Sequence, residues 1–160
     1  MDLTPKRPAD SATEMVQVVL PNDANPLGFI LGGTVMHLID ITGAIACHRH
    51  TRTRLVTAAV DDLQFLYPIR VGDLIILRAR VTCVFTTSLE VQVDVFSEET
   101  LTGRRRRTSR AFLTFVAIDR DCERVQIPPL LIETDEDRKM CDEATERRVA
   151  RLKRKQEALG

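Results

Sequence analysis

Hydrophobic positions follow two different periods along this 160-residue chain. The stretch "GGTVMHLIDITGAIACHRH", Gly32 to His50, is apolar on nearly every side after its two glycines and predicts a long helix. Gly33 and Thr34 suit its start, since threonine is an acceptable N-cap and glycine permits an unusual backbone angle. At 1.5 Å per residue, residues 33–50 span about 27 Å.

From Leu55 the period changes to two, which indicates strands. "SLEVQVDVF", Ser88 to Phe96, alternates most cleanly, and a bulge or twist is expected at Asp61–Asp62. Short connections predict that the last four strands form an antiparallel meander. The predicted strands are 14–21, 55–68, 74–85, 88–96 and 104–119.

A helix that is apolar nearly all round must be covered on every side, whereas one sheet covers a single side. We therefore expect an α+β domain in which the sheet curls around the helix and a second subunit covers the remainder. Residues 14–132 form this domain, behind a loose polar arm at 1–13. Residues 133–160 form a charged helix, acidic first and basic last, as the helix macrodipole favours.

The 23 basic residues cancel the 23 acidic ones, so no overall field favours nucleic acid or an anionic membrane. No signal peptide is evident, and no apolar run approaches the ~20 residues of a membrane span. The four cysteines are scattered without a C-x-x-C motif, which argues against a metal site. Cys47 and Cys83 are expected as small core residues in a reducing, cytoplasmic protein.

Asp40 is the anomaly, because burying a lone carboxylate in an apolar helix is costly. Its neighbours one turn away are Met36, His37, Gly43 and Ala44, and none is a reliable cation. Asp40 either acts chemically, faces a polar crevice, or pairs with an arginine from another strand. For His37, His48 and His50 a surface or packing role is favoured over a metal or base role.

"NDANPLGFILGGTVMHLID" followed by "LVTAAVDDLQFLYPIRVGD" resembles the hotdog-fold acyl-CoA thioesterases, specifically the cytosolic acyl-CoA hydrolase branch. The shared features are A-N-x-x-G, a G-G pair, an aspartate seven residues later, V-T-x-A-V-D-x-x-x-F and P-I-x-V-G-D. The similarity covers residues 14–138. It implies a sheet wrapped around the central helix and pairs of subunits with active sites at their interface, commonly assembled as trimers of dimers.

The resemblance also implies roles for individual residues. Asp40 is the catalytic acid, and Asn25 of the opposite subunit faces it, although by itself an asparagine in such a loop is usually a turn former. Backbone N–H groups of Gly32 and Gly33 polarise the thioester carbonyl, which is compatible with glycine used for close packing. Thr57 is expected as a polar residue near the site.

Coenzyme A enters this family as part of the substrate, and no other cofactor is implied. Thr87 and Ser88 are expected to bind it, although Phe85 and Thr86 stand where relatives carry glycine and arginine. Arg104 to Arg107 either meet its phosphates or form a solvated hairpin edge. Leu31 departs from the aromatic or histidine common in relatives, which leaves the acyl chain length open.

The sequence thus favours an acyl-CoA thioesterase that binds neither nucleic acid nor membrane. One alternative is a non-catalytic acyl-CoA sensor, which usually carries a DNA-binding domain that is not evident here. Another is an acyl dehydratase, which would need a histidine near the helix start, where Leu31 and Thr34 stand.

Overall fold

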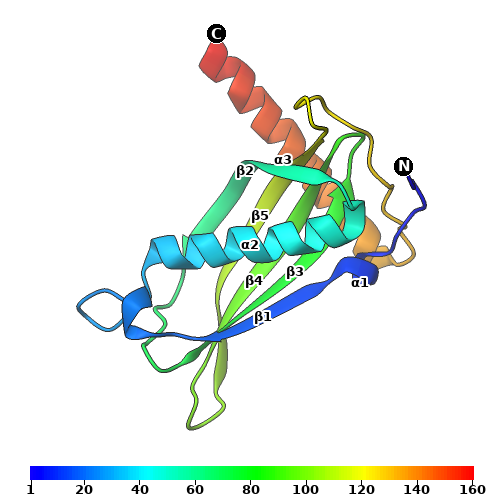
Figure 1. Cartoon of the computed structure of the whole chain (residues 1–160). Coiled ribbons are helices and arrows are strands. Elements are labelled where there is room, and N and C mark those ends of the chain that lie inside the picture. Colours follow the sequence, from blue (N-terminus) through cyan, green and yellow to red (C-terminus); the bar gives the residue numbers. More distant parts are fainter.

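A computed structural model describes residues 1–160 as a five-stranded antiparallel sheet with one long helix on each face (Figure 1). Helix α2 lies along one face of the sheet, and α3 crosses the other face and extends beyond it. The elements are α1 (Pro8–Ser11), β1 (Thr13–Val18), the 3-10 turn η1 (Pro21–Asp23), α2 (Gly32–Thr51), β2 (Arg54–Phe65), β3 (Leu74–Val84), β4 (Ser88–Glu98), β5 (Arg105–Ile118) and α3 (Asp135–Leu159).

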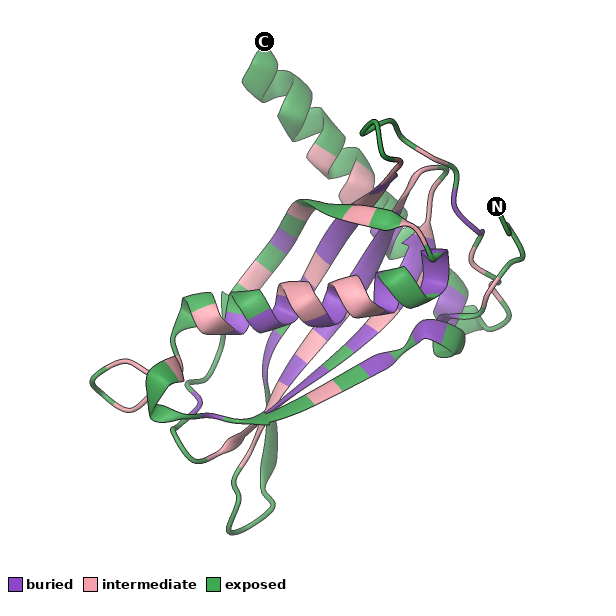
Figure 2. Cartoon of the chain, viewed as in Figure 1, coloured by how far each residue is buried: buried purple, intermediate pink, exposed green.

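The predicted apolar helix is confirmed, and its inner face forms the core with the sheet. Ile39 and Cys47 of α2 are fully buried there. Gly43 permits the close approach, since a Cβ on it would lie 3.1 Å from Val91 and 3.4 Å from Val93. The outer face of α2 stays partly exposed, as Figure 2 shows, and Met36 on it is 47% exposed.

The order of strands is β1-β3-β4-β5-β2. The predicted meander is therefore correct for β3, β4 and β5 but wrong for β2, which pairs with β5 at the far side of the sheet. The connection 66–73 crosses the end of the sheet, where backbone contacts with the loop before α2 hold it. Ile30 N–H donates to the Ile69 carbonyl at 2.8 Å, and Phe29 bridges to Arg70.

β2 forms an edge of the sheet and carries the expected irregularity. Its register against β5 shifts between Thr57 and Ala59 and again between Asp61 and Gln64. Asp62, within the second shift, has a φ of 48°. The free edge is apolar, since Val56 and Val60 are each 45% exposed. An exposed apolar edge strand invites pairing with another strand.

Five ion pairs join α3 to its face of the sheet, and three of them are close. Glu90 of β4 is almost fully buried and accepts two hydrogen bonds from Arg147, at 2.8 and 3.0 Å. Asp61 of β2 accepts from Arg151 at 2.9 Å, and Arg80 pairs with Asp137. The helix begins as the charge pattern predicts, with Thr134 as N-cap and acidic residues in the first turn.

The expectation for the cysteines is half right. Cys47 is buried in the core, where burial raises the pKa of its thiol and keeps it inert. Cys83 is buried too, but it forms a disulfide with Cys141 of α3, with Cα atoms 4.6 Å apart. Sequence spacing could not reveal this bond, because it joins β3 to a helix 58 residues away.

The N-terminal arm, expected to be loose, is docked against the body. Lys6 N–H donates to the Pro129 carbonyl and Lys6 Nζ to the His50 carbonyl, at 3.2 and 2.8 Å. Ser11 of α1 is fully buried. None of the helices combines the length and the apolar character needed to cross a bilayer.

Candidate active site

Asp40 lies midway along α2, where the helix passes β2. Thr57 of β2 donates its hydroxyl to Asp40 Oδ1 at 2.7 Å. The long-range contact depends on β2 leaving the end of α2 and running back alongside it. Within the chain, Thr57 is the one side chain hydrogen-bonded to Asp40, so Oδ2 is free to face a ligand.

The arginine partner considered for Asp40 is not present in the chain, since none of the ion pairs includes this carboxylate. Asp40 is half-buried rather than sealed in the core. Its side chain opens into a cavity of about 330 Å³ between α2 and β2. The cavity is lined by Gly33, Met36, His37, Ile39, Asp40, Thr57, Val60, Leu63 and Leu113.

This lining is mostly apolar, with Asp40 and Thr57 as a single polar pair beside His37. Such a wall suits an acyl group next to a reacting carbonyl. Sequence reasoning did not single out Met36, Val60 or Leu63 as lining residues. The period of two along β2 and of 3.6 along α2 indicates on which face of its own element each residue lies. It does not show which residues of the other element that face meets.

The two glycines begin α2 as predicted, although Leu31 and not Thr34 is the N-cap, and Leu31 offers no side-chain cap. Both glycines have ordinary helical backbone angles, so the unusual angle suggested for this position is absent. Their N–H groups have no acceptor within the helix or elsewhere in the chain.

Packing in the chain does not demand a glycine at 33. A Cβ on Gly33 would meet nothing within 4 Å, whereas one on Gly32 would touch the ring of Phe65 at 3.5 Å. Gly33 lines the Asp40 cavity, so its free N–H lies in the same cavity as the carboxylate. A helix N-terminus is a favourable place for a developing negative charge.

Asn25 lies in the loop before α2 and orders it. Its Oδ1 accepts from the N–H groups of Leu27 and Phe29, at 3.0 and 3.2 Å. Its amide nitrogen makes no hydrogen bond within the chain. Asn25 and Gly32 line a second cavity of about 400 Å³, separate from the one that holds Asp40. One chain therefore does not bring Asn25 and Asp40 into the same cavity.

Thr87 lies in the turn between β3 and β4, and Ser88 is the first residue of β4. Their side chains line a third cavity, of about 570 Å³, on the face of the sheet that carries α3. The structure thus separates them from the Asp40 cavity within one chain. Arg104 and Arg106 lie at the opposite end of β5, where Arg106 stacks on Tyr67 with its guanidinium carbon 4.3 Å from the ring centre.

The other two histidines lie away from Asp40. His48 is exposed, and its Nδ1 is 3.0 Å from the Thr53 carbonyl. His50 is fully buried and its Nε2 is 2.8 Å from the Pro128 carbonyl, which is a packing role. No group of three or more His, Cys, Asp or Glu side chains gathers where it could hold a metal ion.

Residues 27–103 match the model of the Thioesterase superfamily. A Bacillus subtilis protein named as an uncharacterised acyl-CoA thioester hydrolase is 39% identical over 137 residues, which cover 86% of this chain and 80% of that protein. The human cytosolic acyl coenzyme A thioester hydrolase is 32% identical over 135 residues. That alignment covers 83% of this chain and 36% of the human protein.

Solved structures match over nearly the whole chain. The acyl-CoA hydrolase of Bacillus cereus superposes with a TM-score of 0.91 at 31% identity, covering 97% of this chain and 94% of that one. An apo-hexameric acyl-CoA thioesterase gives 0.89 at 36% identity, covering 94% and 97%.

The acyl-CoA hydrolase of Staphylococcus aureus, solved with butyryl coenzyme A and coenzyme A, gives a TM-score of 0.86 at 30% identity and covers 96% of each chain. That enzyme was also solved with an aspartate, an asparagine or a threonine replaced by alanine.

Proposed function

This chain belongs to the hotdog acyl-CoA thioesterase family, and we propose that it hydrolyses fatty acyl-CoA with Asp40 as the acting carboxylate, at a site shared by two subunits. The observation that carries the proposal is the Asp40–Thr57 pair beside the free N–H of Gly33 in one apolar cavity. A carboxylate, an oxyanion donor and an acyl-sized wall are what thioester hydrolysis needs.

The chemistry follows from this arrangement. The thioester carbonyl oxygen accepts a hydrogen bond from the N–H group of Gly33, which stabilises its negative charge as the carbonyl is attacked, whereas Gly32 lines the neighbouring cavity. Asp40 Oδ2 either removes a proton from the attacking water or attacks the carbonyl itself. The C–S bond then breaks. If Asp40 has activated water, it returns the proton to the departing thiolate, and the acyl group leaves as the free acid. If Asp40 has attacked, the acyl group stays on Oδ2 as a mixed anhydride until water hydrolyses it to the acid, and a proton of that water passes to the thiolate.

The spacing of three residues supports these roles. In the Staphylococcus aureus variants, the replaced asparagine, aspartate and threonine are separated by 15 and 17 residues. Asn25, Asp40 and Thr57 have the same two spacings in this chain. We assign Asn25 of the partner subunit to orient the water or the thioester opposite Asp40, since its amide donor is unused within its own chain.

Oligomerisation belongs to the same proposal. The apolar free edge of β2 adjoins the Asp40 cavity, so pairing two β2 edges would bring two cavities together. The hexameric relative supports a trimer of such dimers. We also propose a cytoplasmic location and no cofactor beyond the coenzyme A of the substrate.

The experiment is release of free thiol from acyl-CoAs of different chain length. We expect Asp40→Asn to lower kcat by a hundredfold or more, as loss of a general acid or base does by roughly 10²–10⁴-fold. Asp142→Asn is the matched control, because Asp142 is an exposed helical aspartate on α3 without an ion-pair partner. Wild-type rates in purified Asp40→Asn would reject the assignment, and binding without turnover by the wild type would favour the sensor.

A single turnover in water carrying heavy oxygen separates the two roles of Asp40. If Asp40 activates water, the heavy oxygen enters the fatty acid directly. If Asp40 attacks, an acyl-aspartyl anhydride forms; when water cleaves it at the Asp40 carboxyl carbon, the first fatty acid carries a light oxygen and the heavy atom is found in Asp40 by peptide mass analysis, so label in Asp40 identifies attack.

A further inference from the structure

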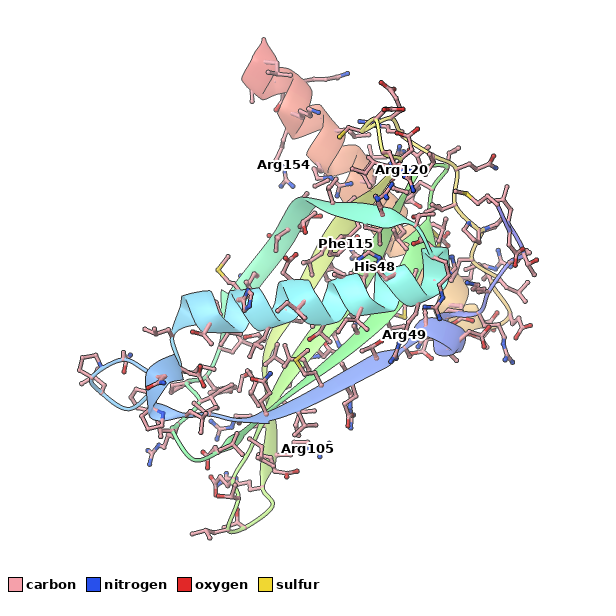
Figure 3. All side chains as sticks on the ribbon, in the orientation of Figure 1. His48, Arg49, Arg105, Phe115, Arg120 and Arg154 are labelled. Atoms are coloured by element: carbon pink, nitrogen blue, oxygen red, sulfur yellow. A yellow bond between two sulfur atoms is a disulfide. The ribbon has the colours of Figure 1, made fainter.

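A nearly buried carboxylate lies in β2 and has no part in the chemistry proposed for the Asp40 cavity. Asp61 is 8% exposed, and its Oδ2 accepts a hydrogen bond from Arg151 of α3 at 2.9 Å. Arg154, one turn further along α3, lies 3.8 Å from Asp61 Oδ1. Figure 3 shows the Arg154 side chain directed from α3 toward β2. Both carboxylate oxygens of Asp61 thus face cations of the same helix.

Stability alone is a weak explanation for this buried ion pair. Taking two charges out of water costs free energy, so replacing such a pair by apolar residues is often neutral or stabilising. In addition, α3 is already joined to the sheet by the Cys83–Cys141 disulfide and by the ion pair of Glu90 with Arg147. Of the ion pairs between α3 and the sheet, only those of Asp61 involve β2. What Asp61 adds is therefore an attachment of α3 to β2.

β2 needs such an attachment because it is irregular around Asp61. Its register against β5 shifts once before Ala59 and once after Asp61. The next residue, Asp62, has a φ of 48°, a left-handed conformation that is unfavourable for most L-residues. On its other side β2 has no partner strand in the chain. Hydrogen bonds to β5 alone therefore leave the position of this part of β2 weakly defined.

The neighbours of Asp61 along β2 face the Asp40 cavity. Successive side chains of a strand point to opposite faces, so Val60 faces the cavity where Asp61 faces α3. Leu63 lines the cavity as well. Thr57, four residues before Asp61, donates to Asp40 Oδ1 at 2.7 Å. A shift of β2 at Asp61 would therefore move both the apolar wall and the donor that holds Asp40.

We propose that Asp61 is a positioning residue for thioester hydrolysis. Held by α3, it fixes β2 so that Thr57 donates to Asp40 and the apolar wall keeps its shape. The inference rests on the proposed function, because it concerns the reaction in the same cavity. It gives α3, which contributes no residue to that cavity, a part in the reaction from the opposite face of the sheet.

Steady-state release of thiol from one acyl-CoA tests the role of Asp61. We expect Asp61→Ala to lower kcat about fivefold with a smaller change in KM, because the Thr57 hydrogen bond is weakened without being removed. Arg151→Gln should give a similar loss, since it removes the other member of the pair. Arg151→Lys keeps the positive charge and should keep most of kcat. These two variants keep the test valid if Asp61→Ala does not fold, because Arg151 is only half-buried.

A double-mutant cycle separates positioning from general damage to the fold. In a Thr57→Val background, the hydrogen bond that Asp61 positions is already absent. Asp61→Ala should then lower kcat by about twofold or less, since residues that act through one contact are not additive. Losses of kcat that multiply in full would overturn the claim that Asp61 acts through Thr57.

Glu90→Gln is the matched structural control. Glu90 is 1% exposed and forms the buried ion pair of α3 with β4, and no residue of β4 lines the Asp40 cavity. This substitution should lower the thermal midpoint at least as much as Asp61→Ala does but leave kcat unchanged. An equal fall of kcat in both variants would show that loosening α3 anywhere impairs the reaction, and would overturn a specific role for Asp61.

The wild type distinguishes failure of this inference from failure of the proposed function. If the wild type releases thiol, and Asp61→Ala and Arg151→Gln both match its kcat, the positioning role is wrong and the proposed function stands. If the wild type releases no thiol from any acyl-CoA, the proposed function is wrong and the role of Asp61 falls with it.

Discussion

A single hydrogen bond, from Thr57 to Asp40 Oδ1, decides which carboxylate oxygen is free to face a substrate. We expect Thr57→Val to lower kcat by about tenfold or more, since a hydrogen bond to a charged group contributes about 1.5–3 kcal/mol. KM should change little, because Thr57 acts by positioning Asp40. Valine suits a strand, so β2 should remain folded.

Steady-state kinetics with one acyl-CoA provide the measurement. Thr57→Ser is the matched control, because it keeps the hydroxyl and should keep most of kcat. Equal kcat values for the valine and serine variants would show that the hydrogen bond does not position Asp40.

His50 sets a limit on stability at low pH. Burial lowers the pKa of His50 below its ordinary value, and the hydrogen bond to the Pro128 carbonyl offsets this in part, with Lys6 and Asp10 acting in opposite directions. The folded state thus holds His50 neutral, whereas the unfolded state takes up a proton below about pH 6.5. The free energy of unfolding should therefore fall as pH drops below about 6.5.

Thermal unfolding between pH 8 and pH 5, roughly the range in which histidine titrates, measures this effect. We expect His50→Gln to be less stable at pH 8 but to lose less stability on acidification. His48→Gln, at an exposed position, should follow the wild-type curve. Parallel curves for wild type and His50→Gln would contradict the assignment.

At the scale of elements, α3 is held by charge and by a covalent bond. The Cys83–Cys141 disulfide closes a loop of 58 residues, for which chain entropy predicts a contribution of about 4 kcal/mol to stability. Cys141→Ser should lower the urea midpoint accordingly and expose α3 amides to hydrogen exchange. The ion pair of Glu90 with Arg147 should keep the helix docked in part.

Urea unfolding with and without reductant provides the measurement. Reductant should lower the urea midpoint of the wild type to that of Cys141→Ser and leave the midpoint of that variant unchanged. Cys122→Ser, which removes an exposed free cysteine, is the control. A wild-type midpoint indifferent to reductant would show that the bond does not contribute.

The elements themselves were largely predictable, because periodicity reports the face that each segment buries. The helix over 32–51 and the alternating strand at 88–98 follow directly from it. The position of β2 beside β5 was not predictable in this way, since alternation says nothing about which strand is the neighbour. Local connections favoured β3, whereas long-range packing against α2 and β5 decided the outcome.

The residues of the candidate sites were likewise predictable only in part. Asp40 was recognisable because a carboxylate in an apolar helix is costly unless it has a use. Basic residues at 148, 151 and 155 share one face of α3, but the sequence gives only their order along the helix and not the residues that this face meets. Asp61 comes from β2, so its meeting with Arg151 depends on the tertiary fold alone.

For the whole molecule, the question is whether one chain suffices for a site. Asn25 and Asp40 line different cavities of the same chain, and the apolar β2 edge beside Asp40 lacks a partner strand. A two-fold axis along that edge would set the Asn25 loop of one subunit opposite Asp40 of the other. The proposal therefore makes a prediction about mixed oligomers.

Asp40→Ala and Asn25→Asp should each be nearly inactive alone. Aspartate at position 25 keeps the oxygen that orders the loop through Leu27 and Phe29 but removes the amide donor. In a mixed dimer, one site receives both substitutions and the other receives neither, because each site draws Asp40 and Asn25 from different chains. Co-expression in equal amounts should thus restore roughly a quarter of wild-type activity per subunit under random pairing.

The measurement is thiol release by the whole co-expressed pool, purified through one tag that both chains carry. If both residues of a site came from the same chain, every site of the mixed dimer would carry one substitution and no activity would return. Asn22→Ala, at an exposed position of the same region, is the control and should be fully active alone. Mixed with Asp40→Ala, it should give activity only in proportion to its share of the chains. Recovery from two inactive parents therefore requires that the site be shared between subunits.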